Sequence, residues 1–249
     1  LAAMTGTVIG LDAGGTDIKL VLYHDGRRIF EKEHDWALAA FTSADPYAHT
    51  LEALVKFAMA MLYLRLHEPG AEQAFADAMA HGAPLERLEE ITRQIEGRAG
   101  KASLEAFTRT HLKAIGMGWP DVVIDGLPTG VSRSKTPQLS DEEVQRLGSL
   151  LKHGIASRFH NIPVPMVNDG AIGALWAGVE LGHGHVWAAS LGTSFGAGYV
   201  NSEGRIPGMP WHLGHLVLNL APGAAHTQTG VEGAAQQHLS QQGVFRLLN

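Results

Sequence analysis

The sequence predicts an α/β fold built on a mixed sheet. Residues 7–34 alternate apolar and polar positions between glycine turns, which is typical of three antiparallel strands. Further along, helical patterns alternate with short apolar runs, which indicates parallel strands joined by helices. One strand–turn–strand pattern also occurs twice, at residues 8–27 and 186–205. Together these observations predict a first α/β domain at 1–182 and a second, partial one at 183–249.

The repeated pattern contains a glycine-threonine turn. In the first copy Gly14, Gly15 and Thr16 follow an apolar run that ends at Asp12. The second copy, after the run 186–191, contributes Gly192, Thr193, Ser194 and Gly196. Glycine lets the backbone approach an anion and adopt positive φ, and hydroxyls add hydrogen-bond donors. Such turns also occur without a ligand, but their repetition favours phosphate binding.

A helical insertion is expected in the first domain at about residues 44–115. Asp45 is expected to cap its first helix, with Pro46 at the first helical position. The stripe that should face a core comprises Leu51, Leu54, Val55, Ala58 and Leu62. A later stripe comprises Leu85, Leu88, Ile91 and Ile95. Packing of this second stripe on its own domain is favoured over a dimer face, and a homodimer stays open.

The elements after the insertion should lead to a ligand site. A buried strand is expected at 121–125, and the capping box at 140–143 should open a helix that ends near Phe159. A short strand is expected at 163–167, with Asn168 and Asp169 at its carboxyl end. The helix that follows carries Ile172, Leu175, Trp176 and Val179 on one face. Ligands of open α/β sheets bind at such strand ends.

Composition excludes several classes of protein. The 249 residues are 45% hydrophobic and 18% charged, which is ordinary for a globular protein. A net charge of −6 without a basic cluster argues against nucleic acid and anionic membranes as partners. Cysteine is absent, which excludes disulfides and thiolate zinc sites. Without a visible membrane span or secretory signal, we expect a cytoplasmic protein.

Two aspartates have the placement that phosphoryl transfer to an alcohol requires. This reaction needs phosphate-binding groups, a divalent metal, and a carboxylate that accepts the hydroxyl proton. Asp12, just before the first turn, is the candidate Mg²⁺ ligand, directly or through water. Asp169 is the candidate general base. Its simpler interpretation is a helix N-cap, which would lower its pKa, and the two roles are compatible.

Two histidines follow the second hairpin. His212 and His215 are three residues apart, which is compatible with a metal site. No third ligand is evident nearby, so hydrogen bonding to a sugar hydroxyl is the favoured interpretation. A dinucleotide-binding domain is not predicted, because the first turn lacks the G-x-G-x-x-G spacing and leads into a strand.

Four segments together resemble the ROK family (repressor, open reading frame, kinase) of the actin and hexokinase superfamily. Residues 11–16 and 191–198 resemble its two phosphate motifs, 167–171 the segment with its catalytic aspartate, and 213–215 its sugar-binding Glu-x-Gly-His segment. The resemblance implies a ribonuclease H-like fold of the actin/hexokinase ATPase type. It spans residues 7 to about 216, except for the helical insertion.

The resemblance implies a glucokinase-like hexose kinase that uses ATP and Mg²⁺ to phosphorylate a sugar hydroxyl. Asn168, Asp169 and His215 would contact the sugar, and Asp169 would take its proton. His212 stands where the family usually has glutamate. The cysteine-rich zinc motif of the family is missing, so no zinc is expected. The second domain is expected to be incomplete, and Glu232 is a weakly matched candidate for a further sugar-contacting glutamate.

Two alternatives stay open from the sequence. One is another small-molecule kinase of the superfamily, acting on an amino sugar or pantothenate, because the phosphate hairpins are shared whereas the acceptor site differs. The other is a sensor that binds sugar without turnover, because the family includes transcriptional repressors. These carry a DNA-binding segment ahead of the first phosphate motif, and only nine residues precede Gly10 here.

Overall fold

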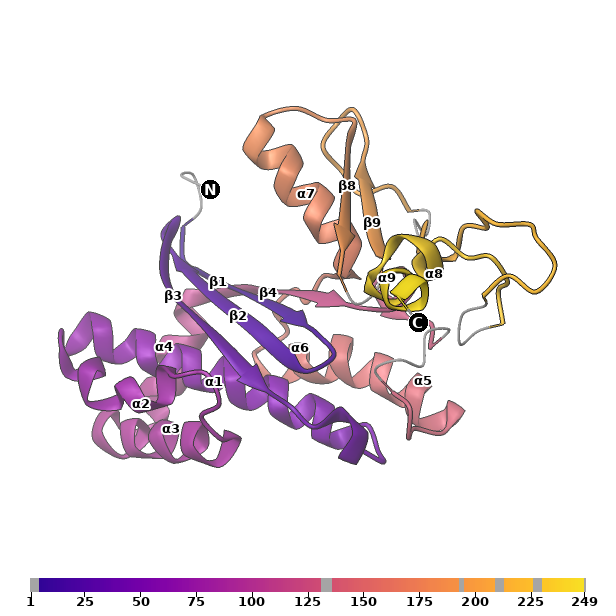
Figure 1. Cartoon of the computed structure of the whole chain (residues 1–249). Helices are drawn as coiled ribbons and strands as arrows, with labels where there is room; N and C mark the ends of the chain where they lie inside the picture. Colours follow the sequence, from indigo (N-terminus) through magenta and orange to yellow (C-terminus); the bar gives the residue numbers. More distant parts are fainter. Residues whose placement is uncertain (1–4, 131–135, 193–194, 209–212, 226–229, 249) are drawn as a thin grey trace. The chain divides into compact units, whose positions relative to one another are not determined.

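The computed structural model describes residues 5–130, 136–192, 195–208, 213–225 and 230–248. The chain forms two compact units (Figure 1). Unit 1 comprises residues 1–119 and 126–166, and unit 2 comprises residues 120–125 and 167–249. The division by compactness therefore falls at 166/167, whereas the domain boundary expected from the sequence lies at 182/183.

Unit 1 is built on a five-stranded mixed sheet of order β3-β2-β1-β4-β7. The antiparallel strands β1 (Thr7–Ala13), β2 (Asp17–His24) and β3 (Arg27–Asp35) confirm the expected N-terminal hairpins. On the other side of β1 lies β4 (Leu112–Trp119), which runs parallel to it. At the edge of the sheet lies β7 (Met166–Asn168), whose first residue is the last of unit 1 and whose other two residues are counted with unit 2. The mixed sheet and its helices confirm the predicted α/β class.

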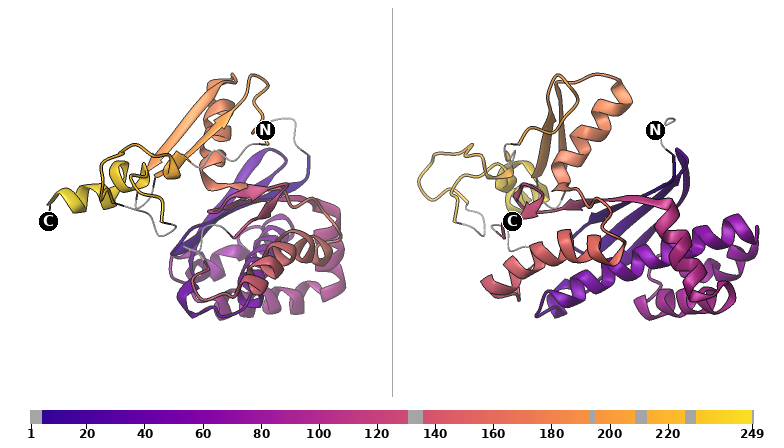
Figure 2. Two further views of the ribbon diagram at one scale, coloured as in Figure 1. Left: turned by 90° about the vertical axis from the view of Figure 1, so that its right-hand side faces the viewer. Right: turned by 180° about the vertical axis from the view of Figure 1, so that it is seen from behind.

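The helices of unit 1 lie on one face of this sheet (Figures 1 and 2). Their bounds are α1 Asp45–His67, α2 Ala76–Met79, α3 Leu85–Ala99, α4 Lys101–His111, α5 Asp141–Ser149 and α6 Ile155–Arg158, with a π-helical turn at Leu150–Gly154 between the last two. The long helix α1 forms the centre of the core, and its five predicted core residues are fully buried. Three of the four residues of the α3 stripe, Leu88, Ile91 and Ile95, are also fully buried within the unit.

One strand lies earlier in the sequence than predicted. The central position beside β1 is taken by β4 at 112–119, where the pattern indicated the end of a helix. The prediction of a buried strand at 121–125 is wrong. Only Val123–Ile124 (β5) forms a strand there, and it pairs with Leu127–Pro128 (β6). The side chain of Ile124 is half exposed. Gly116 and Gly118 interrupt the apolar pattern of β4 and concealed it.

Capping residues join α1 to α5. The expectation that Asp45 caps α1 is wrong, because α1 begins at Asp45 itself, and this carboxylate accepts a hydrogen bond from Arg146 at 2.6 Å. The capping box holds in part: Ser140 Oγ accepts from the Glu143 amide at 3.2 Å. The Glu143 carboxylate accepts instead from the Ala44 amide at 2.7 Å, so α5 caps the start of α1.

Unit 2 is built on the antiparallel hairpin of β8 (Val186–Leu191) and β9 (Phe195–Val200). The helix α7 (Asp169–Leu181) packs along this hairpin (Figure 2). A short 3-10 helix at Leu213–His215 and the helices α8 (Gln236–Leu239) and α9 (Gln241–Leu248) complete the unit. Within the described residues, no helix is both long and apolar enough to cross a lipid bilayer.

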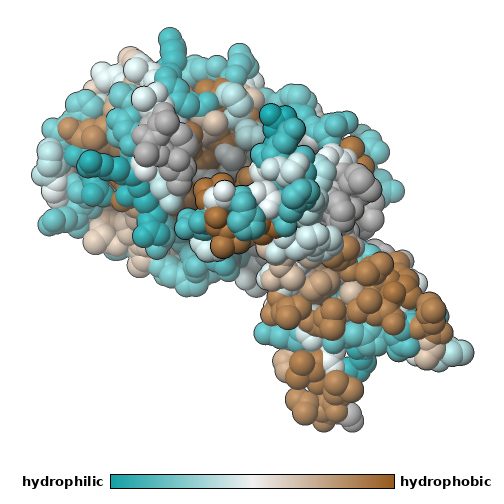
Figure 3. All heavy atoms as spheres, turned by 90° about the horizontal axis from the view of Figure 1, so that it is seen from above, coloured by the Kyte–Doolittle hydropathy of each residue, from teal (hydrophilic) through white to brown (hydrophobic). Residues whose placement is uncertain are grey.

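Unit 2 exposes many large apolar side chains. The small residues of α7, Ala171, Ala174 and Gly178, face the hairpin and are buried. The exposed residues are Leu175, Trp176, Val179 and Leu181 of α7, Trp187 and Leu191 of β8, and Leu216, Val217, Leu218, Leu220, Leu239, Val244, Phe245, Leu247 and Leu248 farther along. Figure 3 shows hydrophobic residues gathered over the C-terminal part of this unit.

Candidate functional site

The first glycine-threonine turn joins β1 to β2 in unit 1. Along β1, Ile9, Leu11 and Ala13 are buried against the helices, so the intervening Asp12 points to the opposite face, where it is exposed. Directly across the β1–β2 ladder from Asp12 lies Lys19, which is also exposed. The strand alternation therefore brings a carboxylate and an ammonium group to one face beside the turn, and the sequence analysis did not identify Lys19.

Close packing explains the glycine at the start of this turn. A Cβ atom on Gly14 would lie 2.8 Å from the carbonyl oxygen of Asp17, closer than real side chains approach. Gly14 and Gly15 do not adopt positive φ, so that part of the argument from the sequence is wrong for this turn. The exposed Thr16 donates its hydroxyl to Asp17 Oδ2 at 3.3 Å. The turn is therefore tight, and its threonine lies at the surface beside β2.

Trp36 fixes the turn from the end of β3. Its backbone amide donates to the carbonyl of Thr16 at 3.1 Å, and its indole Nε1–H donates to the carbonyl of Gly14 at 3.2 Å. The ring itself is held by edge-to-face contacts with Phe41, Tyr47 and Trp119, with centroids 5.7–6.4 Å apart. Burial in this cluster raises the pKa of Tyr47 to about 12. An aromatic residue after the strand was the only sign of this role in the sequence pattern.

Asn168 and Asp169 occupy the first turn of α7 in unit 2. Asn168 is the N-cap: its Oδ1 accepts from the Gly170 amide at 3.0 Å, and its Nδ2 donates to the Asp121 carbonyl at 3.0 Å. The N-cap interpretation of Asp169 is therefore wrong. Asp169 is the first helical residue and is exposed, with Oδ1 accepting from the same amide at 2.8 Å. A carboxylate here interacts favourably with the positive end of the helix.

Glycines bring the start of α7 directly onto β9. A Cβ on Gly170 would lie 2.6 Å from the carbonyl oxygen of Ala197, and one on Gly198 would overlap the carbonyl of Gly170. Helix and strand thus touch backbone to backbone, which only glycine permits. As a result, Asp169 lies next to the strand that leaves the second glycine turn, of which Gly192 and Gly196 are described. Thr193, Ser194 and His212 lie outside the described residues.

The remaining predicted sugar contacts lie farther along unit 2. A Cβ on Gly214 would lie 2.5 Å from the carbonyl oxygen of Phe195, so the half-buried His215 follows a segment packed on the start of β9. Antiparallel pairing of Val217 with Ala234 joins this segment to residues 233–235. Glu232 is exposed beyond this bridge. Along the pairing, Gln236, rather than Glu232, is the residue nearest the level of His215.

The described residues contain no group of three or more histidine, aspartate or glutamate side chains that could hold a metal ion by themselves. Asp12 and Asp17 both offer a carboxylate beside the first turn, but that of Asp17 accepts from the Thr16 hydroxyl at 3.3 Å and lies 4.0 Å from the Lys19 ammonium, so Asp12 is the candidate metal ligand. Mg²⁺ typically takes one or two protein carboxylates and completes its octahedron with phosphate oxygens and water. The donor set at Asp12 therefore fits a metal that arrives with a nucleotide, rather than a resident metal with a complete protein cage.

Solved structures share this fold. A ROK hexokinase from Thermus thermophilus is similar with a TM-score of 0.51 and 22% identity over 97% of this chain. A ROK family transcriptional regulator, a homologue of the E. coli MLC protein, is similar with a TM-score of 0.54 and 14% identity over 97% of this chain. A ROK family protein from Streptococcus pneumoniae in complex with sucrose has a TM-score of 0.50 and 14% identity over 96% of this chain. The chain therefore has the actin/hexokinase-type fold of ROK proteins.

The matched structures are longer than this chain. It spans 62% of the hexokinase, 48% of the regulator and 60% of the sucrose-bound protein. No protein-family model matches the sequence, and no curated protein sequence matches it. The proteins that share the fold include both an enzyme and a regulator, so the fold is compatible with either activity.

Proposed function

We propose that this protein is an ATP-dependent sugar kinase of the ROK type that phosphorylates a sugar hydroxyl. Asp169 acts as the general base, and Asn168, His212, His215 and Glu232 are the proposed sugar contacts. Gly14, Gly15 and Thr16 form one phosphate-binding turn, and Gly192, Thr193, Ser194 and Gly196 form the other. Sugar and nucleotide are the small-molecule partners, and we propose a cytoplasmic protein that binds neither nucleic acid nor membrane.

The start of α7 carries this proposal. Gly170 and Gly198 bring the exposed carboxylate of Asp169 next to the strand that follows the second glycine turn. The proposed proton acceptor and the proposed phosphate-binding turn therefore belong to one helix–hairpin segment of unit 2. Phosphoryl transfer to an alcohol requires this pairing, because the base must reach the hydroxyl that attacks the phosphorus.

Three hydrogen bonds hold the start of α7, where the proposed base Asp169 lies. Its Oδ1 accepts from the Gly170 amide, which fixes the carboxylate at the helix terminus. The neighbouring Asn168 uses both ends of its amide to hold the loop and the helix. Asn168 therefore acts as a positioning residue for the base, whatever contact it makes with the sugar.

Mg²⁺, brought by the nucleotide, would be held by Asp12 and would offset the negative charge of the transferred phosphoryl group. The chain contributes the turn that Trp36 fixes by two hydrogen bonds. Lys19, on the same face as Asp12, brings an ammonium group beside the turn, 4.0 Å from Asp17 Oδ1. These residues bind and orient the phosphates, whereas Asp169 accepts the proton of the sugar hydroxyl.

Replacing Asp169 tests the proposal. Asp169→Asn keeps an oxygen that can accept from the Gly170 amide but cannot take a proton, so turnover should fall about 10²–10⁴-fold while sugar binding changes little. ATP consumption would be measured with a panel of hexoses, amino sugars and pantothenate, and sugar binding by calorimetry. Glu180→Gln, an exposed carboxylate on the same helix, is the matched control and should leave turnover unchanged.

The same experiment separates the alternatives. Turnover only with an amino sugar or pantothenate would keep the kinase mechanism and change the acceptor. Sugar binding without ATP consumption in the unsubstituted protein would identify a sensor, as the similarity to a transcriptional regulator allows. Equal turnover in the Asp169→Asn variant and the unsubstituted protein would contradict the role of Asp169.

A further inference from the structure

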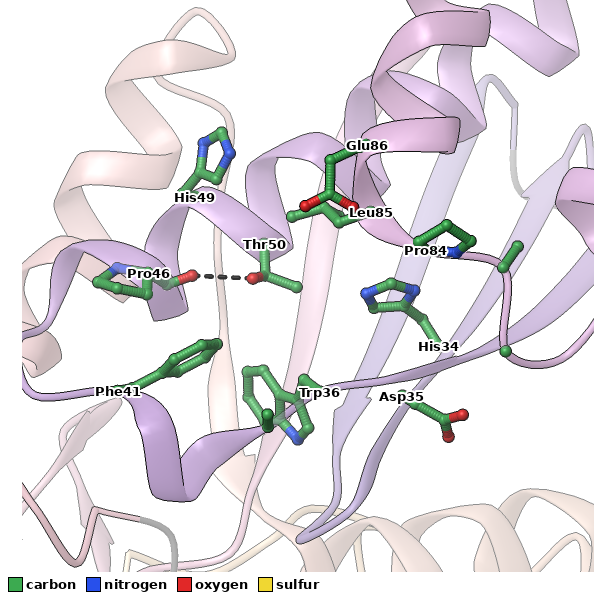
Figure 4. Close-up of a pocket in the computed structure, with 13 residues that line it drawn as sticks. His34, Asp35, Trp36, Phe41, Pro46, His49, Thr50, Pro84, Leu85 and Glu86 are labelled. Atoms are coloured by element: carbon green, nitrogen blue, oxygen red, sulfur yellow. Dashed lines mark hydrogen bonds between the residues drawn. The ribbon is translucent and has the colours of Figure 1, made fainter.

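Trp36 lies between the first glycine-threonine turn and a pocket of unit 1. The pocket has a volume of about 450 Å³, and Figure 4 shows Trp36 and Phe41 along one side of it. Phe41, Tyr47 and Trp119 contact the indole ring. Because part of the ring borders this pocket, packing encloses it incompletely. The hydrogen bond from Nε1–H to the Gly14 carbonyl at 3.2 Å supplies a further constraint on its orientation.

The two hydrogen bonds that Trp36 donates differ in what they require of this residue. Its backbone amide donates to the carbonyl of Thr16 at 3.1 Å, which any residue except proline can do. The bond to the carbonyl of Gly14 needs a side chain that carries an N–H donor on a flat ring. The choice of tryptophan at position 36 therefore acts on the Gly14 carbonyl.

The peptide group that joins Gly14 to Gly15 is the one that the indole bond orients. A glycine stands on each side of this group, so the backbone resists its rotation less than it does elsewhere. The peptide is trans, and in a trans peptide the carbonyl and the following amide point in opposite directions. Because the Gly14 carbonyl is directed to the indole, the N–H of Gly15 is directed away from Trp36.

The Gly15 amide is available to a ligand. It donates to no group within the part of the chain that the structure describes, and Gly15 is partly exposed. The exposed Asp12 and Thr16 lie beside it in the sequence of the turn. Backbone amides of this kind are the donors that bind phosphate oxygens in tight turns. The indole bond therefore determines where the turn presents one phosphate donor.

We propose that Trp36 is a positioning residue for the nucleotide, because its indole N–H holds the 14–15 peptide with the Gly15 amide presented to a phosphate oxygen. The inference rests on the proposed function, since it takes the first turn as a phosphate-binding turn. Without the indole bond, this peptide group has to be ordered when the nucleotide binds, and that ordering costs affinity. Sugar binding does not use this turn and stays unchanged.

The affinity for MgATP tests the role of the indole bond. Trp36→Phe keeps the backbone bond and an aromatic ring but removes the donor. The MgATP affinity of the full chain, measured by calorimetry, should therefore fall about two- to ten-fold, with sugar affinity unchanged. A second variant carries β-(3-benzothienyl)alanine at position 36, which keeps the fused ring and has sulfur in place of N–H. It should show the same loss with the packing intact.

Phe41→Leu is the matched control. Phe41 contacts the same ring but donates no hydrogen bond to the turn, so its substitution reduces packing and leaves the indole bond in place. The MgATP affinity of this variant should equal that of the unsubstituted protein.

The Gly15 amide can also be observed directly. Gly14 and Gly15 are the only adjacent glycines of the chain, so glycine labelled with ¹³C at the carbonyl and with ¹⁵N gives one amide that follows a labelled carbonyl. MgATP should shift this proton resonance downfield in the unsubstituted protein, as a hydrogen bond to a phosphate oxygen does. In Trp36→Phe without nucleotide the resonance should broaden, because the peptide group exchanges between orientations. A loss of stability alone would not broaden it.

The outcomes separate the role of Trp36 from the kinase activity. Equal MgATP affinity in Trp36→Phe and the unsubstituted protein, an equal loss in Phe41→Leu, or no shift at Gly15 on saturation with MgATP would each overturn the role of Trp36, even in a protein that consumes ATP. MgATP binding that depends on Trp36 without ATP consumption would support that role and contradict the kinase activity. Absence of MgATP binding would contradict both.

Discussion

Unit 1 buries its large apolar side chains, whereas unit 2 exposes many of its own. In unit 1, Leu51, Leu54 and Leu62 of α1 are completely buried beneath the sheet. In unit 2, Trp176 is 65% exposed and Leu247 is 88% exposed. The helix α7 contacts the hairpin through alanine and glycine, so the larger side chains of α7 are exposed. Extensive exposed apolar surface is typical of a surface that another protein segment covers, whereas unit 1 has a core of its own.

The largest expected change in the free energy of unfolding comes from truncating one leucine in each unit, which tests this difference in burial. Leu54→Ala opens a cavity in the core of unit 1 and should cost about 2–5 kcal/mol of unfolding free energy. Leu181→Ala, on the 61% exposed Leu181 of α7, should change stability by less than about 0.5 kcal/mol. Hydrogen exchange across a urea titration reports the two units separately. A large cost for Leu181→Ala would mean that its side chain is covered in solution.

A smaller effect is expected at the cap of α7, on which the stability of the helix in unit 2 depends. Asn168→Ala removes the acceptor of the Gly170 amide and the donor to the Asp121 carbonyl, and should cost about 0.5–2 kcal/mol. Asn168→Asp keeps the cap but loses the donor, so it should recover most of this loss. Amide exchange in α7 measures both variants. Equal exchange in all three proteins would show that the cap does not stabilise the helix.

The smallest effect is a pH dependence confined to unit 1. Because the pKa of His34 is lowered in the folded protein, the unfolded chain binds the proton more tightly. Unit 1 should therefore lose stability as pH falls through about 6.5, and level off below the folded pKa. His34→Gln should flatten this slope, by up to about 1.4 kcal/mol for each unit of pKa difference.

Urea midpoints between pH 8 and pH 5 measure that slope. His153→Gln, which replaces an exposed histidine of the same unit, is the control and should keep the slope of the unsubstituted protein. A slope that persists unchanged in the His34→Gln variant would assign the pH dependence to other groups, including His111, whose pKa is also lowered, chiefly by burial.

Local patterns predicted those parts of the fold that local physics determines. The N-terminal hairpins, the cap at Ser140 and the helix after Asp169 are encoded by alternation, capping residues and glycine within a few positions. The central strand β4 was missed because its core position follows from pairing with β1, a contact more than a hundred residues apart. The glycines of β4 suggest an interruption of the strand, but they are tolerated because the neighbouring strands supply the backbone hydrogen bonds.

The candidate site also combines features that local sequence predicts with features that depend on long-range contacts. Asp12, Asp169 and the two glycine turns could be proposed from the sequence because the chemistry of phosphate and proton transfer limits the residue types that serve it. The role of Asn168 as cap, the position of Lys19 opposite Asp12 and the hydrogen bonds of Trp36 depend on registers and on contacts between strands. No spacing in the sequence encodes these features.

The indole of Trp36 gives the protein an internal probe. Its N–H is bonded to a carbonyl of the first turn, so any displacement of that turn changes the electronic environment of one proton. Among the five tryptophans of the chain, its side-chain NMR resonance can be assigned by loss in a Trp36→Phe variant. Titration with nucleotide can then be followed at a single resonance, without a label on the ligand and without turnover.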